Sequence, residues 1–358
     1  SGPTPCARRG DGHATLHSML REFLISEALH GLGVPTTRSL MVLETPTKVW
    51  RNTDQRGGLL VRVAPHHLRV GTLEYAIRAL EPREYARYAG AVLQRTTQGW
   101  AKESALGREQ SLYTPGPLEA EAVGAFFEEW SSRQAALLAD WMRVGFVHGV
   151  LNTDNINITG ESFDYGPWRF TEKWDPSFTA AYFDQSGLYA FGRQAEALHW
   201  NLGQLAVALR LVSDAPPLIA ALERFPDLYQ QSVIRRFLWR LGVVSKGEDE
   251  DKRLVEAAER AMVRDQIPIA AFFHGYRGGR TGSLETKGAD QAAFEDILRG
   301  YSPVNASDDY WLSNPACAML IDEVEMIWDA IAQKDDWQPL YQKLAHIQDL
   351  GKALKHEG

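Results

Sequence analysis

The sequence predicts an α+β protein, with strands in a small N-terminal part and helices in most of the remainder. Two neighbouring strands are expected at 38–50 and 58–64, joined by a polar turn at 52–57. A helix is expected before them, over 14–32, because apolar residues recur there at spacings of three and four. From residue 118 onward, most segments have helical periodicity, which predicts a larger helical part.

The composition is that of a globular chain and argues against several classes of protein. The 358 residues are 44% hydrophobic and include 11 Trp, enough to bury a sizeable core. No apolar run is long enough to cross a bilayer, so we expect no membrane partner. The net charge of −8 gives no electrostatic reason to expect nucleic acid as a partner. The cysteines, Cys6 and Cys317, form no metal motif or disulfide framework, which favours an intracellular setting.

Charged residues interrupt the apolar pattern of the N-terminal part at two positions. Glu22 falls near the edge of the apolar face of the first helix, where an acid is costly unless a cation pairs with it. An exposed surface position is the alternative for Glu22 and for Glu27. Arg62 interrupts the second strand and is expected to hold an anion or a buried acid; an outward-facing arginine on an edge strand fits equally well. The GDG sequence around Asp11 has the composition of an ordinary tight turn.

The larger part is expected to consist of helices joined by a few irregular segments. An aromatic-rich irregular segment is expected at 169–192, an acidic linker at 246–252 and a flexible, glycine- and arginine-rich surface loop at 275–282. A phosphate-binding loop is not expected at 275–282, because no strand precedes it and no GK[ST] follows. The expected helices are 82–95, 118–144, 194–213, 216–224, 226–243, 252–266, 289–299, 315–333 and 338–355.

The stretch 145–168 has the composition of a metal and phosphate site. A polar loop with His148, Asp154 and Asn155 follows a short apolar segment, and Asp164 comes soon after. Mg²⁺ prefers oxygen ligands and usually takes one or two carboxylates, with substrate phosphates completing its shell. His148 fits a hydrogen-bonded core position equally well, and either acid alone could cap a turn. The two acids with Asn155 between them favour the metal site.

The order of these segments is that of protein kinases. In kinases a helix with a glutamate precedes a catalytic loop that begins with His, and a DFG motif follows. Here DYG at 164–166 matches DFG in kind, but Asp154 stands directly before Asn155 instead of five residues earlier.

Four segments closely resemble the selenoprotein O (SelO/YdiU) family. They are the opening SGPTPCARRGDGHATLHSMLREFLISEALHGLGVPTTRSL, RVAPHHLRVG at 62–71, HGVLNTDNINITGESFDYGPWRF at 148–170 and DQSGLYAFGRQAEALHWNLGQLAVAL at 184–209. The resemblance implies a kinase-like fold of two lobes, with the remainder of an N-terminal lobe at 1–75 and a helical C-terminal lobe at 76–358. The catalytic loop would be 148–155.

The resemblance also implies a reaction and the residues that perform it. Members of the family transfer AMP from ATP to Ser, Thr or Tyr hydroxyls of proteins, and pyrophosphate leaves. The implied cofactors are ATP and Mg²⁺, with Mn²⁺ as a possible substitute. By position in the motifs, Asp154 is the proton acceptor, Asn155 and Asp164 bind the metal, Asp164, Asp11 and Gly12 contact nucleotide, Arg62 and Arg69 hold phosphates, and Glu22 takes the place of the kinase helix glutamate.

Departures from the family pattern leave other functions open. The family's ATP-pairing lysine would lie two residues ahead of Ser1, its glycine-rich loop lies further upstream, and its C-terminal selenocysteine or cysteine motif is absent. On that expectation, residues 1–358 alone bind ATP weakly or not at all. The alternatives are an ordinary kinase that phosphorylates a protein or a small molecule and a non-catalytic, nucleotide-binding pseudokinase. Bacterial members of the family are cytoplasmic and eukaryotic members mitochondrial.

Overall fold

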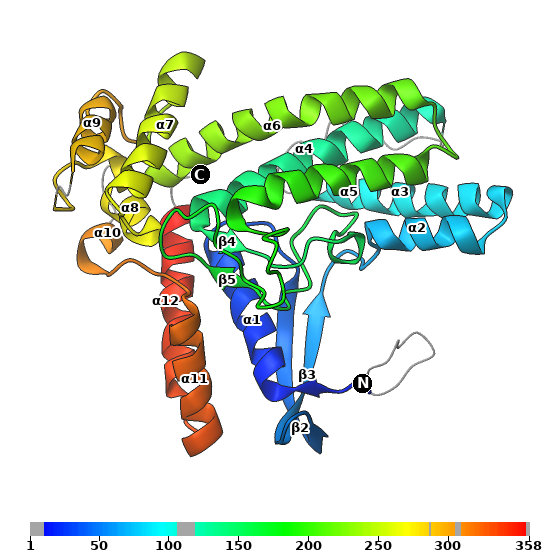
Figure 1. Cartoon of the computed structure of the whole chain (residues 1–358), viewed down its shortest axis with the longest axis horizontal. Helices are drawn as coiled ribbons and strands as arrows, with labels where there is room; N and C mark the ends of the chain where they lie inside the picture. Colours follow the sequence, from blue (N-terminus) through cyan, green and yellow to red (C-terminus); the bar gives the residue numbers. More distant parts are fainter. Residues whose placement is uncertain (1–10, 106–118, 286–287, 305–308, 356–358) are drawn as a thin grey trace.

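A computed structural model describes residues 11–105, 119–285, 288–304 and 309–355. It confirms the α+β class: a three-stranded sheet lies at one end of the molecule and helices make up most of the rest (Figure 1). The two-lobe, kinase-like arrangement remains a prediction. No helix in the described ranges has both the length and the apolar character that crossing a bilayer requires.

The sheet has the strand order β1-β3-β2 and is antiparallel, with β1 at Ala14–Thr15, β2 at Arg38–Trp50 and β3 at Asp54–Val63. The predicted bounds of β2 are confirmed, but the predicted turn at 52–57 is too long. The polar residues from Asp54 onward belong to β3 and pair with the C-terminal end of β2. This end of the hairpin is exposed, so its residues form a strand without the apolar alternation that predicts one. The tip of the hairpin is therefore a three-residue turn at 51–53.

Helix α1, Leu16–Gly31, packs between this sheet and helix α12, Gln338–Lys355 (Figure 1). It begins where the side chain of Thr15 accepts a hydrogen bond from the Ser18 N–H, as a helix N-cap does. Helix α11, Ile321–Lys334, also reaches α1, because Glu325 forms an ion pair with Arg21 at 3.0 Å. The last helices of the chain therefore support the first.

Helices form a layer above the sheet in Figure 1. They are α2 (Val70–Ala79), α3 (Pro82–Ala105), α4 (Ala120–Val144), α5 (Gln194–Leu209) and α6 (Ala215–Leu241). Helix α2 was not predicted separately, and the helix predicted at 82–95 continues to Ala105. Two helices were predicted at 216–224 and 226–243, but α6 is one helix that contains Pro226. Proline removes one helical hydrogen bond, and buried contacts of Leu218, Ala221 and Phe225 hold the helix together around it.

The remaining helices correct three predictions. They are α7 (Glu248–Arg264), α8 (Ile269–Gly275), α9 (Ala289–Leu298) and α10 (Tyr310–Ser313). The predicted acidic linker is the first turn of α7, where four acids face the positive helix end. The predicted flexible loop at 275–282 is packed instead: Arg277 is buried and donates a hydrogen bond to the Arg240 carbonyl at 3.0 Å. Residues 315–320 lack helical structure, and α11 begins at Ile321.

The crossing of α1 and α12 depends on a glycine. A Cβ at Gly31 would lie 2.7 Å from Ile347 Cγ2 and 2.8 Å from its carbonyl oxygen. We expect Gly31→Ala to lower the free energy of unfolding by about 1–3 kcal/mol, because overpacking outweighs the gain in helix propensity. Denaturant titration measures the change.

Gly203 in α5 is the matched control, since a Cβ there would have no heavy atom within 4 Å. We expect Gly203→Ala to raise the free energy of unfolding by up to about 1 kcal/mol. If both variants change stability in the same direction, the close approach at Gly31 does not limit this crossing.

Candidate active site

The polar loop predicted as a metal site begins and ends at one place in the fold. Strand β4, Phe146–Val147, pairs antiparallel with β5, Arg169–Phe170. The segment between the two strands is therefore a long loop whose two ends lie next to each other. Within it, a short 3₁₀ turn at Thr153–Asn155 is capped by the Asn152 side chain, which accepts a hydrogen bond from the Asp154 N–H at 2.9 Å. The loop thereby places Asp154 and Asn155 side by side.

Asp164 joins this turn through its side chain. Asn155 Nδ2 donates a hydrogen bond to Asp164 Oδ2 at 2.9 Å, although nine residues separate the two in sequence. Asp164 has a left-handed backbone with φ of 63°, which is uncommon for a residue other than glycine. Such outliers are often found at functional sites.

His148 supports the loop from inside the core. It is buried, and its Nε2–H donates a hydrogen bond to the Phe163 carbonyl at 2.9 Å. Burial lowers the pKa of His148, so the ring is neutral near pH 7. Gln194 accepts a hydrogen bond from the His148 N–H and donates one to the Phe146 carbonyl, both at 3.0 Å. The alternative of a hydrogen-bonded core histidine is therefore the correct one.

Backbone hydrogen bonds join the middle of the loop to two segments of the N-terminal part. Ile158 donates to the Leu68 carbonyl at 2.9 Å, and Val70 donates to the Ile156 carbonyl at 3.0 Å. Further along, Thr37 donates to the Ser162 carbonyl at 3.1 Å. The segment between the two site acids is thus held from both sides.

Glu22 and Arg62 form a largely buried ion pair. Their side chains are 13% and 15% exposed. Burial raises the pKa of Glu22, an effect that the charge of Asp164 adds to and that Arg62 and the Tyr165 backbone oppose. The expectation that Glu22 needs a cation and that Arg62 holds an anion or a buried acid is confirmed, and the exposed alternatives are wrong. Phosphate binding by Arg62 remains a prediction.

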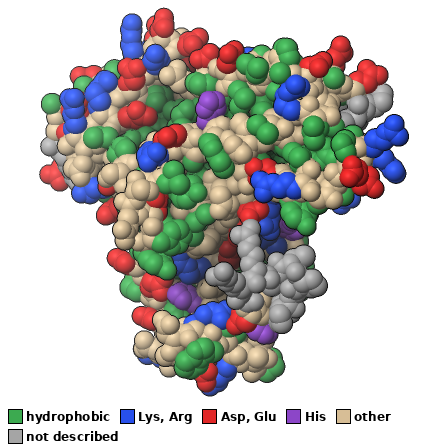
Figure 2. All heavy atoms as spheres, turned by 45° about the vertical axis from the view of Figure 1, so that its right-hand side comes forward, with side chains coloured by type: hydrophobic (Ala, Val, Ile, Leu, Met, Phe, Trp, Pro, Cys, Tyr) green, Lys and Arg blue, Asp and Glu red, His purple; other side chains and the backbone are tan. Residues whose placement is uncertain are grey.

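Arg69 and Arg62 both contact Phe163: their guanidinium groups lie 5.0 and 5.9 Å from the centre of its ring. Arg69 and Asp154 line an open groove of about 580 Å³. Acidic and basic side chains lie together where the broad helical part meets the narrower hairpin end (Figure 2). The site therefore combines an accessible carboxylate with nearby cations.

Sequence reasoning missed Gly71 and Phe163 as parts of this site. A Cβ at Gly71 would lie 2.4 Å from Asp154 Oδ1, so the start of α2 packs directly against the predicted proton acceptor. The signals were present in RVG at 69–71 and FDY at 163–165, but neither residue type is chemically reactive.

Asp11 lies apart from these residues. Its carboxylate pairs with Arg51 Nη1 at 2.9 Å and accepts a hydrogen bond from the His13 N–H at 3.0 Å. The ion pair with Arg51 lowers the pKa of Asp11 to about 2. The structure does not bring Asp11 into contact with Asp154 or Asp164. A nucleotide-binding role for Asp11 and the adjacent Gly12 remains a prediction.

Asn155 and Asp164 are suitable ligands for Mg²⁺. Their side chains converge within hydrogen-bonding distance and together provide a carboxylate and an amide oxygen. No cluster of three or more His, Cys, Asp or Glu side chains suited to a metal occurs among the described residues. A donor set of this size fits Mg²⁺, which needs few protein ligands when phosphates complete its shell.

Comparison with known proteins identifies the family. The family model described as "Protein adenylyltransferase SelO" matches residues 1–348. A "Protein nucleotidyltransferase YdiU" from Gloeobacter violaceus is 35% identical over 97% of this chain and 73% of its own length. A protein of the same name from Mycolicibacterium smegmatis is 38% identical over 87% of this chain and 60% of its own length. The chain belongs to the SelO family.

The buried ion pair predicts a pH-dependent loss of stability. Arg62→Met leaves Glu22 buried without its cation, so we expect the free energy of unfolding to fall by about 3 kcal/mol at pH 8. The variant raises the pKa of Glu22 further above that of the wild type, so at lower pH Glu22 becomes neutral and the difference shrinks. Urea unfolding of both proteins at pH 5 and pH 8 measures this difference.

Arg224→Met is the control, because Arg224 pairs with Glu128 and both side chains are exposed, at 59% and 51%. We expect it to cost about 1 kcal/mol or less. An equal cost of Arg62→Met at both pH values would show that Glu22 does not titrate as an uncompensated buried acid.

Proposed function

We propose that this protein transfers AMP from ATP to Ser, Thr or Tyr hydroxyls of other proteins, with Mg²⁺ as cofactor. The observation that carries the proposal is the contact between Asn155 and Asp164, next in sequence to Asp154, whose side chain lines a groove together with Arg69. Membership of the SelO family, whose relatives are named protein nucleotidyltransferases, supports nucleotidyl transfer.

Each side chain has a role that follows from its position. Asp154 accepts the proton of the attacking hydroxyl, because its carboxylate lines the open groove where an acceptor protein can reach it. Arg69 binds phosphate oxygens through its planar guanidinium group. Asn155 and Asp164 would hold Mg²⁺, which neutralises charge on the phosphates when bound.

The reaction is balanced by one bond formed and one broken. The hydroxyl oxygen of the acceptor bonds to the α-phosphorus of ATP, and the bond from that phosphorus to the bridging oxygen breaks. Pyrophosphate leaves, and the hydroxyl proton passes to Asp154. Arg62, which pairs with Glu22 and contacts the same Phe163 ring as Arg69, would share in binding the charge of the leaving group.

Isotope position in ATP tests which phosphate is transferred. We expect protein labelling from [α-³²P]ATP and none from [γ-³²P]ATP, with the protein expressed from its complete reading frame and MgCl₂ present. Labelling only from the γ position would identify an ordinary kinase and refute AMP transfer. Absence of labelling from both, with ATP still bound, would identify a non-catalytic pseudokinase.

Substitution of the proposed proton acceptor tests its role. We expect Asp154→Asn to lower kcat for AMP transfer by on the order of 100-fold or more, with ATP affinity little changed, because the amide cannot accept the proton. Asp164→Asn should instead weaken binding of Mg²⁺ and nucleotide, measured by calorimetry.

Asp175→Asn is the matched control: this exposed acid accepts hydrogen bonds from Ser177 and lies outside the proposed machinery. It should leave AMP transfer unchanged. Full activity of Asp154→Asn would remove Asp154 from the mechanism.

A further inference from the structure

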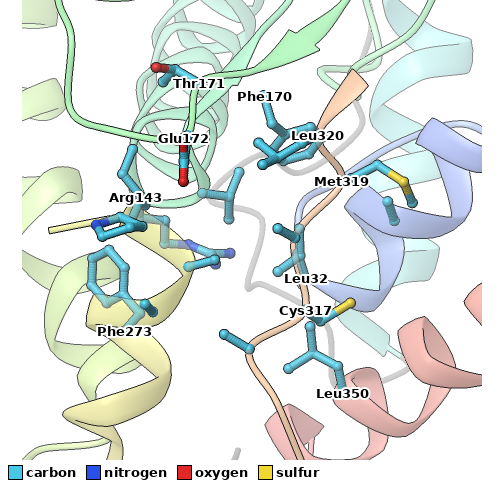
Figure 3. Close-up of a pocket in the computed structure, with 18 of the residues that line it drawn as sticks. Leu32, Arg143, Phe170, Thr171, Glu172, Phe273, Cys317, Met319, Leu320 and Leu350 are labelled. Atoms are coloured by element: carbon cyan, nitrogen blue, oxygen red, sulfur yellow. The ribbon is translucent and has the colours of Figure 1, made fainter. Parts of the chain in front are cut away.

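A second pocket, distinct from the groove beside Asp154, lies where α1, α4, α6, α8 and α12 come together. Its volume is about 180 Å³, and most of its lining is apolar, including Leu32, Ile269, Met319 and Leu350. Arg143 and Phe273 lie on one side of it in Figure 3, and Leu32 and Leu350 lie on the opposite side.

The pocket is also lined by a buried arginine without a counterion. Arg240, near the end of α6, is 4% exposed, and its enclosed Nε and Nη1 atoms have no hydrogen-bond partner among the described residues. Its guanidinium group lies 5.9 Å from the centre of the Phe273 ring, which offers only a weak attraction. Buried charges are normally paired, so this one points to a missing anion.

Neighbouring acids do not supply that anion. Asp140 is buried and its Oδ1 pairs with Arg143 Nε at 2.7 Å and with Arg236 Nε at 3.3 Å. Its Oδ2 has no hydrogen-bond partner among the described residues, and Asp140 forms no ion pair with Arg240. Arg143 also has an enclosed Nη1 that no described residue contacts by a hydrogen bond. Glu172 lines the pocket but is exposed and forms no ion pair with any described residue. Positive charge is therefore in excess around the pocket.

Arg240 remains charged at neutral pH. Burial, together with the nearby charges of Arg143 and Arg277, lowers its pKa to about 9. At pH 7 the group is still almost entirely protonated, so an anion entering the pocket meets a full positive charge.

We propose that this pocket binds a small organic carboxylate, with its carboxylate on Arg240 and its apolar body between α1, α8 and α12. A planar guanidinium matches a carboxylate through two parallel hydrogen bonds. A cavity of about 150 Å³ holds benzene, so about 180 Å³ suits one ring or a short chain beside a carboxylate. Inorganic phosphate fits poorly, because the apolar walls leave most of its oxygens without donors.

The site is independent of the proposed AMP transfer, and either proposal can fail alone. It has a structural connection to the candidate active site, since Ala28 of α1 lines the pocket and Glu22 lies on the same helix. A bound carboxylate would contact the helix that positions the Glu22–Arg62 pair.

Calorimetric titration with benzoate tests the proposal directly. We expect one molecule of benzoate to bind, at least tenfold more tightly than its neutral isostere benzamide and than inorganic phosphate. Benzoate should also slow alkylation of Cys317, which lines the pocket, as followed by mass spectrometry. No binding of benzoate or hexanoate, equal binding of benzamide, or stronger binding of phosphate would each overturn the proposal.

Two variants locate the binding. Arg240→Met keeps a side chain of similar length without the charge and should weaken benzoate binding at least tenfold, whereas Arg253→Met, at an exposed position on α7, should leave it unchanged. Ala316→Leu keeps Arg240 but enlarges a side chain that lines the pocket, so it should block benzoate as well and decides the case if Arg240→Met fails to fold. Undiminished binding by a folded Arg240→Met or by Ala316→Leu would place the benzoate elsewhere.

Discussion

The ion pair between Glu22 and Arg62 connects the parts of the candidate site. Glu22 comes from α1 and Arg62 from β3, and Asp164 is close enough for its charge to raise the pKa of Glu22. An acid on the apolar side of a helix is tolerated only with a cation beside it. That requirement fixes α1 against the sheet, and it keeps one arginine of the site from turning toward solvent.

Sequence patterns correctly predicted the elements that are determined by residues close together in the sequence. The bounds of β2 and α12 follow from apolar periodicity and match the structure, and the closeness of Asn155 and Asp164 follows from a short loop between strands. The need of Glu22 for a cation could also be predicted from the sequence, because an acid at an apolar position is costly unless a cation pairs with it. Its partner could not, since 40 residues separate the two in sequence.

Predictions failed where distant packing decides local structure. A proline usually ends a helix, yet α6 continues through Pro226 because its buried face packs along α4. The loop at 275–282 has a flexible composition, but Arg277 and Arg280 hold it by donating to backbone carbonyls of other segments. Gly71 stands in the RVG sequence at 69–71, but its role beside Asp154 depends on the docking of α2, which these local residues do not specify.

The contact between the first helix and the last ones has a consequence for how the protein is made. Arg21 and its partner Glu325 are 304 residues apart, so at roughly 5–20 residues per second roughly 15–60 s of synthesis separate them. During that interval the side of α1 that faces α12 is without its partner. The N-terminal part therefore completes its packing only after α11 and α12 have been synthesised, so late docking of these helices is a required step of folding.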